Sequence, residues 1–287
     1  MAYAVKPPTR RQVISLIGAA CAAPAILRAE VPIRLGLTPV FLDNDAEVIS
    51  RLRLALGQGT GRPIDLVQRR TYQEVTGLLL EGSVDAAWLC GFPFLQHEES
   101  LALLGVPIWR RAPLYQSYLI VHADDPAQGL EDLERGTHAF SDPDSNSGWL
   151  VTVSDIVRMG ARPDTFFDRT LFAYGHRNVA RSVAGGLTRS GSIDGYVWEA
   201  LAQVELALTA RTRVISRSEP LGFPPFVTRR DHLGTQAVQS LRRALFGLAD
   251  SVEGKAALRL LQLDGIEASE PALFDGIRAR MRDLQNR

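Results

Sequence analysis

The sequence of 287 residues contains only two cysteines, Cys21 and Cys90. Cys21 lies in an N-terminal segment that we expect to be removed, and the single cysteine left cannot form an internal disulfide. No apolar run is long enough to span a bilayer comfortably. Four of the 32 basic residues precede the first acidic residue, Glu30, so the rest has 28 basic and 32 acidic residues. That balance argues against a nucleic-acid-binding surface.

The sequence also lacks the common catalytic and metal-binding motifs. It has no Gly-x-Ser-x-Gly elbow, no P-loop, and no Gly-x-Gly-x-x-Gly after a predicted strand. It has no His-x-x-x-His and no Cys-x-x-Cys, so we expect neither a metal site nor a cofactor. Ser145 or Ser147, His176 and Asp194 supply the side chains of a catalytic triad, but nothing in the sequence fixes a contact among them. We therefore expect a protein that is not an enzyme.

Residues 1–29 have the pattern of an export signal. Arg10 and Arg11 precede a short apolar run, residues 13–23, and residues 24–29 resemble a cleavage region ending at Ala29. The twin arginine is typical of substrates of the twin-arginine export machinery. We expect the mature chain to lie in the periplasm after cleavage near Ala29.

The mature chain repeats one α/β pattern. Residues 31–94 read as strand, helix, strand, helix, strand, and residues 139–208 repeat that order. Each unit contains small residues followed by an apolar residue and an aspartate, residues 82–85 and 191–194. Such units build parallel sheets covered by helices. We expect one lobe from residues 30–117 and 216–287, a second from 118–215, and a ligand cleft between them at the carboxyl ends of the strands.

The most informative segment is 141–150, Ser-Asp-Pro-Asp-Ser-Asn-Ser-Gly-Trp-Leu, between a short strand and a predicted helix over 146–159. The first N–H groups of a helix are unpaired and carry partial positive charge. With the hydroxyls of Ser145 and Ser147 and the amide of Asn146, they favour binding of an anion. The alternative is an ordinary helix cap formed by Asp144 or Ser145.

Taken together, these segments resemble the phosphonate-type substrate-binding proteins of ABC transporters, which are type II periplasmic binding proteins. The resemblance covers roughly 31–250 and is carried by segments 140–148, 84–94 and 194–198. It implies an α/β fold of two lobes, each a mainly parallel sheet flanked by helices. It also implies capture of a small phosphate-, phosphite- or phosphonate-like oxyanion by lobe closure and its delivery to an ABC permease. We expect a monomer.

The resemblance implies that Ser145, Asn146 and Ser147 clasp the anion, with Asn146 where the family usually has threonine. Tyr72, Tyr115 and His176 would face the cleft, although the tyrosines could be core residues and His176 a helix cap. Asp194 would accept a hydrogen bond from a protonated ligand oxygen, or would only brace a turn. The full set of expected ligand-binding residues is Phe41, Tyr72, Cys90, Tyr115, Ser145, Asn146, Ser147, Gly148, His176 and Asp194.

Cys90 leaves a second function open. A small buried cysteine is an ordinary core residue. A thiol facing the cleft would instead suit a thiophilic ligand such as arsenite, and a subgroup of the family resembles arsenite-binding partners of membrane sensor kinases. The sequence therefore predicts either a transporter component or an arsenite-binding accessory of a sensor kinase.

Overall fold

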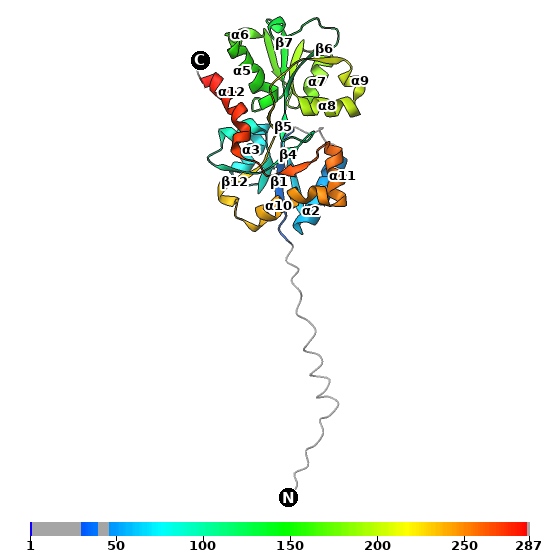
Figure 1. The fold of residues 1–287 in the computed structure, drawn as a ribbon, viewed down its shortest axis with the longest axis vertical. Helices are drawn as coiled ribbons and strands as arrows, with labels where there is room; N and C mark the ends of the chain where they lie inside the picture. The colour runs from blue at the N-terminus through cyan, green and yellow to red at the C-terminus, as the bar shows by residue number, and fades with distance from the viewer. Residues whose placement is uncertain (2–29, 40–45, 286–287) are drawn as a thin grey trace. The chain divides into compact units, whose positions relative to one another are not determined.

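The computed structural model describes residues 1, 30–39 and 46–285, and residues Pro32–Arg287 form one compact unit. The predicted export signal and Phe41 lie outside the described residues. The unit contains two large sheets, one of six strands and one of five, together with a two-stranded ribbon (Figure 1).

The six-stranded sheet has a parallel part and an antiparallel part. β1 pairs in parallel with β2 and β3, whereas β12, β4 and β13 add antiparallel pairings. Its strands in spatial order are β13 (Gly265–Glu267), β4 (Leu101–Ile108), β12 (Phe226–Arg229), β3 (Ala86–Trp88), β1 (Ile33–Leu37) and β2 (Ile64–Gln68). The helices of these chain segments are α2 (Ala46–Thr60), α3 (Tyr72–Leu80), α4 (Gly91–Gln96), α10 (Gln236–Phe246) and α11 (Val252–Leu261), with short turns η3 (Arg230–His232) and η4 (Gly247–Asp250).

The five-stranded sheet is built the same way. β7 pairs in parallel with β8 and β9, and β6 and β10 pair antiparallel. In spatial order its strands are β10 (Thr212–Arg217), β6 (Ser117–His122), β9 (Ser190–Asp194), β7 (Thr137–Phe140) and β8 (Arg169–Phe172). Its helices are η2 (Asn146–Leu150), α5 (Val151–Arg158), α6 (Pro163–Phe166), α7 (His176–Ala184), α8 (Gly195–Val204) and α9 (Leu206–Thr209), with the short turn η1 (Glu131–Leu133).

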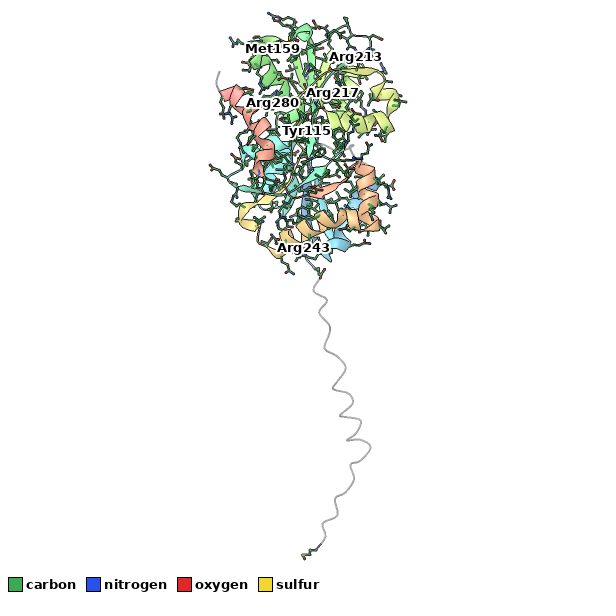
Figure 2. All side chains as sticks on the ribbon, in the orientation of Figure 1. Tyr115, Met159, Arg213, Arg217, Arg243 and Arg280 are labelled. Atoms are coloured by element: carbon green, nitrogen blue, oxygen red, sulfur yellow. The ribbon has the colours of Figure 1, made fainter. Side chains whose placement is uncertain are left out.

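The chain passes between the sheets through residues 109–116 and 218–225. There β5 (Leu114–Tyr115) and β11 (Leu221–Gly222) pair antiparallel as the ribbon, and Figure 2 labels Tyr115 at this passage. After the turn η5 (Pro271–Phe274), helix α12 (Asp275–Gln285) contacts β11, α4 and α5 (Figure 1). Two backbone passages and one helix therefore link the sheets.

The α/β class and the two-sheet architecture are as predicted, but the sheets are mixed rather than mainly parallel. The predicted repeat supplies only the three parallel strands in each, β2-β1-β3 and β8-β7-β9. The predicted lobe boundaries, between residues 117 and 118 and between 215 and 216, fall within β6 and β10, which pair with each other inside the five-stranded sheet. The division into lobes at residues 118 and 216 remains a prediction.

Candidate functional site

The segment after β7 begins a helix, as its sequence predicts. Ser145 is the N-cap, and its hydroxyl accepts a 3.0 Å hydrogen bond from Gly148 N–H. The backbone N–H of Leu150 donates to Ser145 O five residues earlier, so the first turn η2 is wider than an α-helical turn before α5 continues. The alternative interpretation, in which Ser145 caps its own helix, is therefore correct. Its hydroxyl proton is still available because the oxygen acts as acceptor in this cap.

Gly148 is the residue whose size this turn restricts most. A Cβ atom built on Gly148 would lie 1.8 Å from Ser141 Oγ and 2.9 Å from Ser145 Oγ. The backbone of Ser141 also donates to Gly148 O, at 3.1 Å, which fixes the end of β7 against the helix start. A glycine is needed here because no other residue leaves room for the two hydroxyls.

Tyr72 lies at the start of α3 and connects it with the five-stranded sheet. Thr71 and Glu74 form a capping box that fixes this helix start. Tyr72 N–H donates to Asp142 Oδ2 at 3.1 Å, and the Tyr72 hydroxyl lies 3.2 Å from His176 Nε2. Asp142 is a contact that our site prediction missed, although it stands inside the segment that we singled out.

His176 has a defined tautomer in this arrangement. Its Nδ1 accepts the backbone N–H of Asp194 at 3.1 Å, so its proton must sit on Nε2, where it faces the Tyr72 oxygen. Burial lowers the pKa of His176 to about 3, which keeps the ring neutral. The Tyr72 oxygen is therefore an acceptor for His176, and its own hydroxyl proton remains available.

Tyr115, from the ribbon, makes an equivalent pair with the start of η2. Asn146 Nδ2 donates to the Tyr115 hydroxyl at 2.8 Å. Burial raises the pKa of both Tyr72 and Tyr115 well above the ordinary value, so both hydroxyls stay protonated. Tyr115 therefore also keeps a free proton.

Cys90 and Asp194 occupy corresponding places in the two repeats. Cys90 comes two residues after β3, and Asp194 is the last residue of β9. Each is the N-cap of the next helix, α4 for Cys90 and α8 for Asp194. The similar segments 82–85 and 191–194 of the sequence suggest instead that Asp85 corresponds to Asp194, but Asp85 precedes β3 and its carboxylate accepts from the backbone N–H of Arg34.

The two N-cap side chains behave differently. Burial raises the pKa of the Cys90 thiol to about 12, and its sulfur accepts the backbone N–H of Asn146 at 3.2 Å. Asp194 Oδ1 accepts from Tyr196 N–H at 2.8 Å and from Val197 N–H at 3.3 Å, so this carboxylate does brace its own helix. Burial raises the pKa of Asp194 to about 7.

The structure brings nine of the ten predicted residues together, and the tenth, Phe41, lies outside the described residues. Eight of these nine residues carry a side chain, and each of the eight is at most 2% exposed. They belong to chain segments of both large sheets and of the ribbon. Tyr72 of α3 contacts α7, and Cys90 and Tyr115 both contact η2. These eight residues are Tyr72, Cys90, Tyr115, Ser145, Asn146, Ser147, His176 and Asp194.

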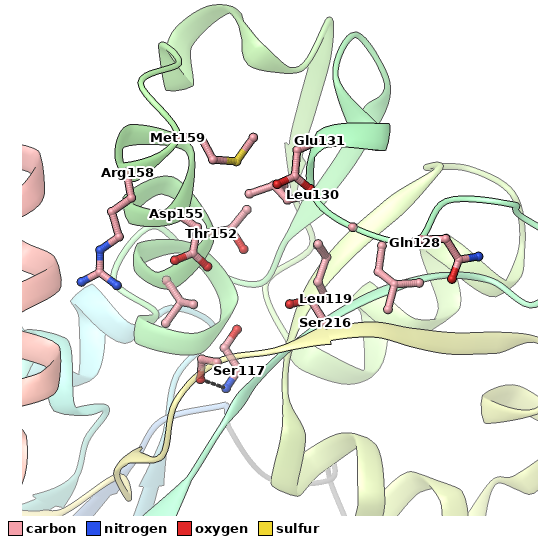
Figure 3. Close-up of a pocket in the computed structure, with 14 residues that line it drawn as sticks. Ser117, Leu119, Gln128, Leu130, Glu131, Thr152, Asp155, Arg158, Met159 and Ser216 are labelled. Carbon is pink, nitrogen blue, oxygen red and sulfur yellow. Dashed lines mark hydrogen bonds between the residues drawn. The ribbon is translucent and has the colours of Figure 1, made fainter.

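A separate cavity of about 360 Å³ lies on the five-stranded sheet, between α5 and the segment 128–131 (Figure 3). Figure 3 shows Thr152 and Met159 on one wall and Leu130 and Glu131 on the other. None of the predicted ligand-binding residues that the structure describes lines this cavity.

Residues 35–274 match the family model described as "ABC transporter, phosphonate, periplasmic substrate-binding protein". The chain belongs to this family. Family members are binding components of transporters rather than enzymes. Among curated proteins, the chain is 25% identical over 257 residues to the phosphate-import protein PhnD of Mycolicibacterium smegmatis, covering 83% of this chain and 80% of that protein.

Solved structures of the family share the fold. A binding-protein component of a phosphonate ABC transporter from Pseudomonas aeruginosa matches with a TM-score of 0.80 and 22% identity, covering 88% of both chains. PhnD1 from Prochlorococcus marinus, solved in complex with methylphosphonate, matches with a TM-score of 0.77 and 15% identity, covering 88% of this chain and 98% of that one. These likenesses confirm the predicted two-lobed periplasmic-binding-protein fold.

Two further findings concern the part of the chain that the structure describes. Within it, no three His, Cys, Asp or Glu side chains are grouped so that they could hold a metal ion. No helix in residues 30–39 and 46–285 is both long and apolar enough to cross a membrane. The family description places its members in the periplasm.

Proposed function

We propose that this protein captures a small phosphorus oxyanion (phosphate, phosphite or a simple phosphonate) and presents it to an ABC permease. The observation that carries the proposal is the pair of buried tyrosine hydroxyls, Tyr72 and Tyr115. Each oxygen accepts a hydrogen bond from a neighbouring side chain, so each proton is left for a further acceptor. An oxyanion supplies acceptors in several directions and would satisfy both tyrosines at once.

The serines of the η2 turn add further donors. Ser145 and Ser147 are buried, and the oxygen of Ser145 already accepts Gly148 N–H. Its proton can therefore be directed at an anion. The Ser147 backbone is fixed as well, because Ser117 Oγ donates to Ser147 O at 2.6 Å. Hydroxyl protons and the positive end of the helix formed by η2 and α5 would all face a negative ligand.

Lobe closure follows from where these donors come from. Tyr72 belongs to α3 beside the six-stranded sheet, whereas Ser145 and Ser147 belong to the η2 turn that follows β7 of the five-stranded sheet. A ligand that touches both groups favours the closed arrangement by its differential affinity for that state. The permease would then recognise the closed form, as in other hinge-closing binding proteins.

The alternative, an arsenite-binding accessory of a sensor kinase, has less support. A thiol with a pKa near 12 is a poor source of thiolate, the form that binds a thiophilic ligand. Cys90 is also the only cysteine among the residues that the structure describes, so no second thiol lies beside it there.

Calorimetric titration of residues 30–287, the expected mature chain, tests the proposal. The panel is phosphate, phosphite, methylphosphonate, sulfate, selenite and arsenite, with arsenite repeated on Cys90→Ala. We expect a phosphorus oxyanion to bind, with an affinity that Cys90→Ala leaves unchanged. Binding of arsenite alone, abolished by Cys90→Ala, would overturn the proposal in favour of a thiol-based sensor.

Export is part of the proposal. We propose that residues 1–29 direct the chain through the twin-arginine machinery and are cleaved near Ala29, and that the mature protein is a monomer. Replacing Arg10 and Arg11 by lysine in the full chain should retain the uncleaved precursor in the cytoplasm. N-terminal sequencing of the exported wild-type protein locates the cut, and size-exclusion chromatography with light scattering gives the oligomeric state.

A further inference from the structure

Asn146 has one polar atom that the protein does not satisfy. The residue is fully buried at the start of η2. Its backbone N–H donates to Cys90 Sγ at 3.2 Å, and its Nδ2 donates to the Tyr115 hydroxyl at 2.8 Å. Its amide oxygen Oδ1 is buried and has no hydrogen-bond partner among the residues that the structure describes. Buried amide oxygens are rarely left without a hydrogen bond, so we expect Oδ1 to accept one from a group outside the protein.

We propose that Asn146 Oδ1 accepts a hydrogen bond from the ligand, so that the site selects an oxyanion that carries its own proton. This inference rests on the proposed function and narrows its ligand class. Phosphate carries at least one proton at neutral pH, whereas sulfate carries none. Sulfate would place an unprotonated oxygen against Asn146 Oδ1 and leave that buried acceptor unpaired, which disfavours binding.

The orientation of the Asn146 amide is consistent with this role. With Nδ2 toward Tyr115, the tyrosine oxygen accepts from Asn146, and the tyrosine proton is free for the anion. Turning the amide by half a rotation would make Tyr115 donate to Oδ1 and would remove that proton from the ligand. One orientation therefore provides both a donor, on Tyr115, and an acceptor, on Asn146.

The other acceptors near Asn146 are largely engaged by the protein. Cys90 Sγ accepts the Asn146 N–H, and Asp142 Oδ2 accepts the Tyr72 N–H. Asp194 Oδ1 accepts two backbone N–H groups of its own helix. Two competing acceptors for a ligand proton remain: the second carboxylate oxygen of Asp194, which has neither of these bonds, and Ser141 Oγ, which is buried without a partner among the described residues. Ser141 Oγ is a hydroxyl that can also donate, so it does not disfavour an unprotonated oxygen, and Asp194 is the main competitor. The experiment must therefore separate Asn146 from Asp194.

The test measures the ratio of phosphate to sulfate affinity by calorimetry at neutral pH, on residues 30–287. We expect wild type to bind phosphate at least about 10-fold more tightly than sulfate. In Asn146→Thr a hydroxyl, which can donate, replaces the acceptor-only oxygen. Sulfate should therefore gain relative to phosphate, and the ratio should fall by about 10-fold. Thr76→Val is the matched control, since Thr76 Oγ1 is another buried atom without a partner among the described residues.

The outcomes separate this inference from the proposed function. If no phosphorus oxyanion binds wild type, the proposed function is wrong. If phosphate binds but sulfate binds equally well, the function stands and this inference is wrong. It is equally wrong if Asn146→Thr keeps the wild-type ratio. If Asp194→Asn then removes the ratio, the preference belongs to Asp194. Should Asn146→Thr not fold, Asn146→Ser supplies the same change with a smaller side chain.

Discussion

At the scale of single residues, the hydroxyl of Tyr72 is the group on which anion binding should depend most directly. Tyr72→Phe removes one donor to the ligand and leaves the ring in place. A hydrogen bond to a charged group contributes about 1.5–3 kcal/mol, so the Kd of the preferred oxyanion should rise at least about 10-fold. Calorimetric titration gives the Kd directly.

The matched control is Tyr118→Phe. Tyr118 is also a buried tyrosine, but its hydroxyl donates to Glu199 at 2.9 Å. Tyr118→Phe should leave the Kd within about twofold of wild type. An unchanged Kd in Tyr72→Phe would remove Tyr72 from the site, and an equal loss in both variants would point to a general loss of packing.

Gly148 offers a stability prediction at the same scale. Gly148→Ala places a methyl group against Ser141 Oγ and Ser145 Oγ, so the η2 turn must shift. Overpacking of this kind costs roughly 1–3 kcal/mol of unfolding free energy, measured by chemical denaturation.

Gly77→Ala is the control for the glycine prediction, since nothing lies within 4 Å of a Cβ at that position in α3. Alanine favours helix over glycine, so this variant should gain about 0.5–1 kcal/mol. A Gly148→Ala variant as stable as wild type would mean that the turn has room that the geometry does not show.

At the scale of elements, the sequence predicts most of the parallel units. The order predicted for residues 31–94 is confirmed by β1, α2, β2, α3 and β3, and a capping box marks the start of α3. The antiparallel additions are harder to foresee. β4 is an almost continuous apolar run without alternation, and β13 has only three residues. Residues 195–197 look like a strand in sequence, but the cap formed by Asp194 begins α8 there.

Helix α12 provides a prediction about an element that links both sheets. Arg280 on α12 is 2% exposed and is labelled in Figure 2. Its guanidinium donates to both carboxylate oxygens of Glu219 and to Asp155 Oδ1 at 2.7 Å. It also donates to Val151 O at 3.0 Å, which fixes α12 to the start of α5.

Arg280→Met should therefore loosen α12. Asp155 and Glu219 are partly exposed and can be solvated, so the expected loss of unfolding free energy is about 1–3 kcal/mol, below that of a fully buried pair. Hydrogen exchange should become faster in α12 and α5. Arg282→Met, on the exposed side of the same helix, should change neither quantity. Equal exchange in the two variants would contradict a linking role for Arg280.

At the scale of the whole molecule, the sequence predicts which residues form the site but not how they pair. Tyr72 and His176 are 104 residues apart, and Tyr72 and Asp142 are 70 apart. Their contacts depend on how the elements of the two sheets meet, which local patterns do not contain. The correspondence of Cys90 with Asp194 is visible only once both are seen to cap a helix after a third strand.

The pH dependence of stability depends on three buried groups of the five-stranded sheet and its helix α7, and it is the last prediction. Burial lowers the pKa of His138 and His176 to about 3, from an ordinary 6.5. Their contribution to stability is present above pH 6.5 and is lost as pH falls toward 3. Burial raises the pKa of Asp194 from 3.8 to about 7, so its contribution is present below pH 3.8 and is lost as pH rises through 7.

The two effects have opposite signs, and single variants separate them. Asp194→Asn keeps a capping side chain but cannot ionise, so its unfolding free energy relative to wild type should rise between pH 4 and 7, by at most about 1.4 kcal/mol per pH unit. His138→Asn should show the reverse trend, losing most at high pH. Denaturation without ligand across this range measures both differences. If both differences changed with pH in the same direction, the opposite pKa shifts of Asp194 and His138 would be contradicted. If the difference for Asp194→Asn did not change with pH, Asp194 would be as well solvated in the folded chain as in the unfolded one.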